Sequence, residues 1–163
     1  MSRYLYICIA LLMFLIFPRE ALSQPEKPFK TKYAVIYYDQ DKDLDDFIWR
    51  LGGQHMDFPI DTSLVSNRVD RVIDRVEAIL DMRPHNFRVE VYLRRGPLQG
   101  ENKVAFYEHK TRAVYCSVDY ASDGVVAHEI AHAVICQYFS IPPPKKMQEI
   151  LTQYVDKYLW SDY

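Results

Sequence analysis

The chain has 163 residues, of which 49% are hydrophobic and 26% are charged, and its formal net charge is −2 at neutral pH. Lysine and arginine are scattered among the acidic residues and form no basic stripe, which argues against nucleic acid as a partner. Thirteen tyrosines and eight phenylalanines favour a folded, aromatic-rich protein over a disordered chain.

Residues 1–23 have the features of a secretory signal peptide. A basic residue, Arg3, precedes an apolar run over residues 4–17, and the small residues Ala21 and Ser23 follow it. The run is short for a membrane span, which needs about 20 apolar residues. We therefore expect cleavage after Ser23 and an exported protein, periplasmic or extracellular. The alternative is an uncleaved anchor, which would make the membrane a partner.

The remaining residues, 24–163, suit one α+β domain with a small mixed sheet of about four strands. Residues 24–31 contain two prolines and are expected to form an extended lead-in. The acidic stretch 39–46 lacks the glycine and the final glutamate of a calcium loop, so we expect it to cap a helix instead. Hydrophobic periodicity predicts strands over residues 33–38, 87–93, 104–107 and 113–118, and helices over residues 47–51, 62–82, 124–139 and 145–160.

The pentapeptide at residues 128–132 carries the strongest functional signal. His128 and His132 are four residues apart and share a helix face with Glu129. Neutral imidazoles bind zinc, and a glutamate beside the metal can take a proton from a zinc-activated water. This is the HExxH pattern of zinc metallopeptidases, which implies Zn²⁺ and a peptide or protein substrate. The alternative is two hydrogen-bonded core histidines with an exposed glutamate.

A zinc site on two histidines needs a third protein ligand. Glu149 lies in the first turn of the helix that follows the prolines at 142–144, and a short connection could aim it at the metal. The alternative role for Glu149 is an interaction with the helix dipole. Cys136 is a weaker candidate, because it has drifted about 80° around the helix from His128. Three histidines expected in loops or at a strand end are poorer candidates still: His55, His85 and His109.

Together these features resemble the gluzincin zinc metallopeptidases, and within them the small proteins called peptidase MA-like. In that family the HExxH helix is followed by a proline-containing loop and a helix with a pattern close to E-G-L-A-x-Y, whose glutamate binds zinc. Residues 149–154 match the Glu, the Leu and the Tyr of this pattern. The resemblance implies a zincin-like fold with His128, His132 and Glu149 as zinc ligands. It also implies Glu129 as the general base in the hydrolysis of peptide bonds.

The chain departs from the family pattern at two positions. Ile150 replaces the usual glycine. Gln153 stands where thermolysin-like relatives have an acidic residue that supports a zinc-binding histidine, and Asp156 is a possible substitute. Tyr154 matches the tyrosine of the family, and it either assists catalysis as an oxyanion donor or packs in the core.

Three classes of function remain open on the sequence. The chain is an exported zinc peptidase, a zinc-binding interaction module of zincin fold without catalytic activity, or a structural zinc protein. Glu129 favours the enzyme, because a structural site needs only its ligands. In peptidases of this type an extended substrate pairs with the edge strand before the zinc helix, for which we predict residues 113–118. The alternative is an ordinary strand whose edge is covered.

Two cysteines, Cys116 and Cys136, remain after removal of the signal segment. In an exported protein an even pair can form a disulfide, but the sequence does not give the distance between the two side chains. We therefore leave two alternatives open, a Cys116–Cys136 disulfide and two free thiols.

Overall fold

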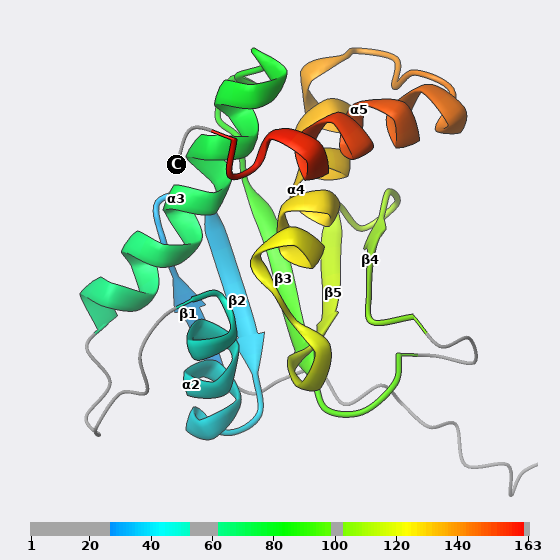
Figure 1. Ribbon diagram of the computed structural model, residues 1–163. Helices are drawn as coiled ribbons and strands as arrows, with labels where there is room; N and C mark the ends of the chain where they lie inside the picture. The colour runs from blue at the N-terminus through cyan, green and yellow to red at the C-terminus, as the bar shows by residue number, and fades with distance from the viewer. Residues whose placement is uncertain (1–26, 53–61, 99–102, 162–163) are drawn as a thin grey trace, which may run out of the picture.

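Figure 1 shows a computed structural model of the chain, which describes residues 27–52, 62–98 and 103–161. The predicted signal segment, residues 1–23, and His55 lie outside the described residues. Within the described residues, no helix has the length and apolar character needed to cross a membrane.

The described residues form one mixed sheet of five strands with the order β1-β2-β3-β5-β4. The three central strands are parallel, and both edge strands are antiparallel to their neighbours. The prediction of an α+β chain with a mixed sheet is therefore confirmed, with one strand more than expected. The strands are β1 (Lys27–Lys30), β2 (Ala34–Tyr38), β3 (Val89–Arg94), β4 (Ala105–Glu108) and β5 (Ala113–Ser117).

The strand that sequence analysis missed is β1, which lies in the proline-containing lead-in. Pro28 pairs with Tyr37 of β2 at the edge of the sheet. Edge strands accept proline because they can leave one N–H position without a ladder partner. The proline content therefore led the sequence analysis to miss this edge strand.

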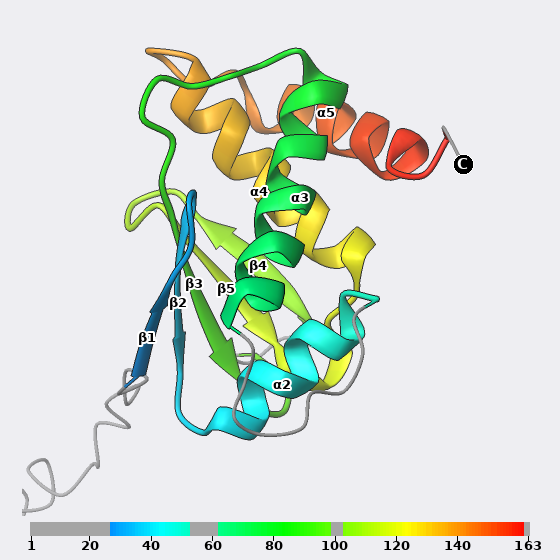
Figure 2. The same ribbon diagram turned by 90° about the vertical axis from the view of Figure 1, so that its left-hand side faces the viewer.

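The four described α-helices all lie on one face of the sheet (Figure 1), and Figure 2 shows the other face free of helices. Gln40 precedes the first of them, and its backbone N–H donates to the side chain of Asp43 at 3.0 Å. The acidic stretch therefore caps a helix, as predicted. The helices are α2 (Asp41–Arg50), α3 (Thr62–Leu80), α4 (Asp123–Tyr138) and α5 (Lys145–Tyr158).

The hydrophobic core lies between the sheet and these helices, with α4 at its centre. Ile130 and Val134 of α4 are fully buried and belong to the same cluster as Ile36 of β2 and Val91 of β3. On the opposite face of the sheet, four rings stack across the strands with centroids 4.8 to 5.1 Å apart. Those rings are Tyr37, Tyr92, Tyr115 and Phe106.

The edge strand next to α4 is β4, and not the segment over residues 113–118 that the sequence suggested. That segment is β5, which pairs with β3 on one side and with β4 on the other. The prediction was wrong because, in the hairpin formed by β4 and β5, the second strand pairs with β3 and the first strand is left at the edge of the sheet. The alternative, a strand whose edge is covered, describes β5.

A network of charges around Arg95 joins α2 to the short helix η1 (Val118–Tyr120). The Arg95 guanidinium contacts Asp43 Oδ1 at 2.7 Å, Asp46 Oδ2 at 2.6 Å and Asp119 Oδ1 at 3.3 Å. The other oxygen of Asp119 accepts a hydrogen bond from the Gly96 N–H at 2.8 Å. We call these four side chains the Arg95 network.

Candidate functional site

Three polar side chains lie near the middle of α4. Ser122 caps the helix by accepting a hydrogen bond from the Val125 N–H, and seven of the sixteen residues that follow are buried. His128, Glu129 and His132 are only partly exposed. Their spacing puts them on one side of the helix, as predicted. The helix therefore presents two imidazoles and a carboxylate beside β4.

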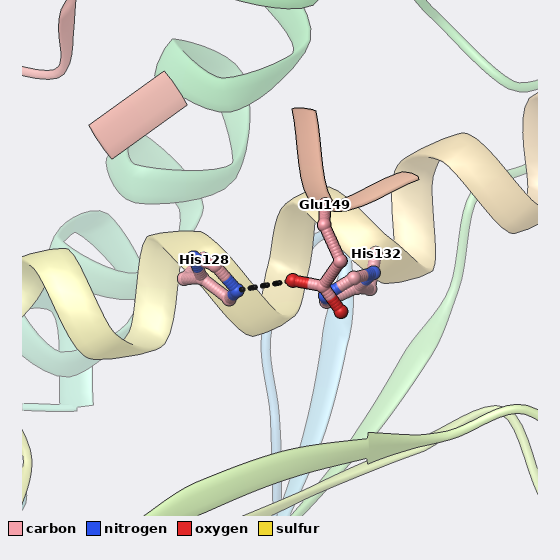
Figure 3. Close-up of side chains that lie close together, drawn as sticks. All are labelled: His128, His132 and Glu149. Carbon is pink, nitrogen blue, oxygen red and sulfur yellow. Dashed lines mark ion pairs between the residues drawn. The ribbon is translucent and has the colours of Figure 1, made fainter. Parts of the chain in front are cut away.

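Glu149 of α5 completes a cluster with the two histidines. Its Oε2 lies 3.7 Å from His128 Nε2, and its Oε1 lies 3.7 Å from His132 Nε2. Figure 3 shows the carboxylate reaching from α5 toward the two rings on α4. One ligand atom from each residue lies within 4.8 Å of the other two. The structure thus brings together the three predicted ligands, which we call the donor triad.

The geometry of the donor triad fits a small cation better than direct hydrogen bonding. A separation of 3.7 Å is longer than a normal hydrogen bond between nitrogen and oxygen. Ligand atoms about 2.1 Å from a tetrahedral zinc would be about 3.4 Å apart. Two imidazoles and one carboxylate are also a donor set that zinc enzymes use. The residues present therefore fit a zinc ion.

Asp156 holds the far side of the His128 ring. Its Oδ2 lies 3.0 Å from His128 Nδ1. A proton on Nδ1 would be donated to this carboxylate, which leaves Nε2 free to bind a metal. Gln153, at the position expected to be acidic, is exposed on α5. Asp156 therefore takes the place that sequence analysis suggested for it.

Glu129 is fixed in position by the backbone of the edge strand. Its Oε2 accepts a hydrogen bond from the Tyr107 N–H of β4 at 2.8 Å. Burial raises the pKa of Glu129, while the neighbouring His128 and this hydrogen bond act in the opposite direction. Glu129 is thus partly buried and bonded to the backbone, and not the exposed glutamate of the alternative interpretation.

Burial lowers the pKa of His132 below its ordinary value of 6.5, although the nearby Glu149 carboxylate acts to raise it. A lowered pKa favours the neutral imidazole, which is the form that binds metals.

Gln148 stabilises the start of α5 by donating its side-chain N–H to the Pro143 carbonyl at 2.8 Å. The loop that aims Glu149 is therefore tied to its own helix.

Cys116 and Cys136 are free thiols and form no disulfide with each other. Cys116 faces the core from β5, and burial raises its pKa to about 12. Cys136 is partly buried on α4, and its Sγ lies 3.5 Å from Gln148 Oε1. The two side chains thus have different surroundings, one in the core and the other against α5. Cys136 is also not a member of the donor triad.

Tyr154 does not lie in the site. Its side chain is 49% exposed, and its ring packs against Tyr158 with the centroids 4.5 Å apart. Tyr154 is five positions after Glu149, which corresponds to about 140° around the helix axis. The structure therefore assigns Tyr154 neither to the core nor to the donor triad.

The donor triad opens into a hollow of about 680 Å³ between β4 and the two helices, which we call the metal cleft. Tyr107 and His109 line its far wall. Sequence analysis had set His109 aside as a residue at a strand end. His109 directly follows β4 and is two residues after Tyr107, and this spacing is the signal that would have placed both on the same side.

Comparison with protein-family models, with curated proteins and with solved structures returned no match.

Proposed function

We propose that the chain is a zinc-dependent metallopeptidase of the gluzincin type, with a zincin-like fold and the donor triad as its metal ligands. The observation that carries the proposal is the donor triad together with Glu129, a carboxylate of the metal cleft that is not part of the triad. A structural zinc site needs only its ligands and commonly closes its fourth position. An additional acidic group in an open cleft therefore favours an enzyme over a structural zinc protein.

The residues of the cleft have distinct roles in this proposal. Zinc held by the donor triad would act as a Lewis acid and lower the pKa of a water toward 7. Glu129 accepts the proton of the attacking water and then passes it to the leaving amine. The Tyr107 N–H orients the Glu129 carboxylate for both transfers. Asp156 is a positioning residue, since it acts through the ring of His128.

The proposed substrate is an extended segment of a peptide or protein, which would pair with β4. An edge strand presents backbone N–H and C=O groups that can add another strand. Both β4 and the donor triad border the metal cleft. The Tyr107 N–H already donates to Glu129, so the substrate would pair with the other backbone groups of the strand.

The test combines zinc content with hydrolysis of a mixed peptide library by the purified protein. For Glu129→Gln we expect unchanged zinc content and a rate lower by about 10²- to 10⁴-fold, the usual contribution of a general base. For Glu149→Ala we expect loss of both zinc and activity. Gln153→Ala, on an exposed part of the same helix, is the matched control and should behave as the wild type.

The results also separate the enzyme from the two classes of function without catalysis. A wild-type protein that binds zinc and cleaves no peptide would favour an interaction module or a structural zinc protein. A protein that binds no zinc would overturn the proposal altogether.

A further inference from the structure

A second hollow of about 580 Å³ adjoins the metal cleft. The two hollows share part of their walls, because four residues line both of them. The surface beside the donor triad is therefore one continuous depression that extends past the end of β4. The shared residues are Tyr107, His109, Cys136 and Pro142.

The second hollow is lined by basic side chains and by no acidic one. Lys110 and Arg112 come from the turn between β4 and β5, and His85 and His109 add two imidazoles. Among the described residues, neither Lys110 nor Arg112 forms an ion pair with a carboxylate. The metal cleft, by contrast, is lined by three glutamates as well as by Lys103 and Lys145. We call the second hollow the basic pocket.

The backbone at the basic pocket adopts a conformation that is uncommon for side-chain-bearing residues. Arg112 has a φ of 56° and Asn86 has a φ of 55°, both in the left-handed region. Asparagine tolerates this region, but for arginine it costs about 1 kcal/mol relative to glycine. Local strain of this kind clusters at functional sites. Glycine would occupy this turn position more easily than Arg112 does. We therefore infer that the charge of the Arg112 side chain has a function.

We propose that the basic pocket binds a carboxylate of the peptide substrate, so that the enzyme selects substrates with an acidic group near the cleaved bond. This inference rests on the proposed function. His132 and Cys136 are one turn apart, about 6 Å along α4, and Cys136 lines both hollows. An extended peptide covers this distance in about two residues. The acidic group therefore lies two or three residues from the cleaved bond.

Binding to the Glu129→Gln variant tests the inference without catalysis. The probes are two fluorescein-labelled, alanine-rich peptides of about ten residues with amidated ends, one carrying two adjacent glutamates and the other two glutamines. We expect the glutamate peptide to bind about two- to thirtyfold more tightly, the sum of two exposed charge pairs. This preference should shrink in 0.5 M salt, which screens exposed charges.

Two substitutions identify the pocket. Adding Lys110→Gln and Arg112→Gln to the Glu129→Gln protein should bring the ratio of the two affinities to about one, with zinc content unchanged. Adding Lys146→Ala instead should keep the ratio, because Lys146 is exposed on α5 and lines neither hollow. A glutamine peptide with a free carboxyl end shows whether a terminal carboxylate serves as well as a side chain.

The outcome for the basic pocket is distinguishable from the outcome for the proposed function. Cleavage of the peptide library with acidic residues enriched two or three positions from the cut supports both. Cleavage without that enrichment, together with equal affinity for the two probes, overturns the basic pocket and leaves the peptidase intact. Selective binding that depends on Lys110 and Arg112, in a protein whose wild type cleaves nothing, supports an anion-binding pocket and overturns the peptidase.

Discussion

The Arg95 network and the donor triad are both clusters of charged side chains, and they differ in how completely their charges are paired. Arg95 contacts three carboxylates at 2.6 to 3.3 Å. In the donor triad the closest contacts of Glu149 with the two histidines are 3.7 Å. The first cluster satisfies its own groups and joins elements of the fold. The second leaves three ligand atoms that converge without bonding to one another, which is the arrangement a cation requires.

Removal of the third ligand should give the largest effect. We expect Glu149→Ala to weaken zinc binding by more than about 100-fold, beyond the 10- to 100-fold cost of losing an outer partner. Competition with a zinc chelator measures the affinity. Gln153→Ala serves as the control on the same helix. Unchanged affinity in Glu149→Ala would show that the third ligand is another residue.

Removal of the partner of His128 should give the next largest effect. Asp156→Ala takes away the carboxylate that lies 3.0 Å from Nδ1, so the ring loses its fixed orientation. We expect zinc affinity to fall by about 10- to 100-fold with an unchanged melting temperature, since the Asp156 side chain is 42% exposed. A drop in melting temperature with full zinc affinity would instead make Asp156 a structural residue.

Disruption of the Arg95 network should change stability and leave metal binding intact. Arg95→Ala leaves Asp43 and Asp46 without their main counter-ion, and both side chains are largely buried. We expect the free energy of unfolding in urea to fall by about 1–3 kcal/mol, typical of lost hydrogen bonds to charged groups. Lys42→Ala removes only the i,i+4 contact of an exposed lysine with Asp46 and should cost about 0.3–0.5 kcal/mol. Weaker zinc binding in Arg95→Ala would break the comparison.

The smallest effect is the pH dependence of the stability that Arg95→Ala removes. Burial acts to raise the pKa of Asp46, but hydrogen bonds from Arg95 and Lys42 outweigh it and hold the pKa below its ordinary value of 3.8. An acid with a lowered pKa stabilises the fold above the ordinary value, and this contribution is lost as the pH falls through the folded pKa. The stability difference between wild type and Arg95→Ala should thus narrow below about pH 3.8. A constant difference down to pH 2 would contradict this linkage.

The sequence predicted the parts of the site that depend on local periodicity. His128, Glu129 and His132 share a face because an α-helix repeats every 3.6 residues. Glu149 was predicted from a short connection between two helices and from a resemblance to a known family. Local periodicity also placed the ends of most helices and strands within two residues of those in the structure.

The remaining features depend on contacts between distant segments. Nothing in the sequence fixes which strand of the β4–β5 hairpin pairs with β3, so the wrong strand was placed at the edge. His109 lines the metal cleft because β4, which it follows, is the edge strand beside α4. The contact of Asp156 with His128 depends on the rotation of α5 about its own axis.

Anomalous diffraction at the zinc absorption edge, from crystals of the zinc-loaded protein, tests the central claim most directly. We predict one peak per chain, about 2.0–2.2 Å from Nε2 of His128, from Nε2 of His132 and from an oxygen of Glu149. The absence of a peak, or a peak bound by other residues such as Cys136, would contradict the account.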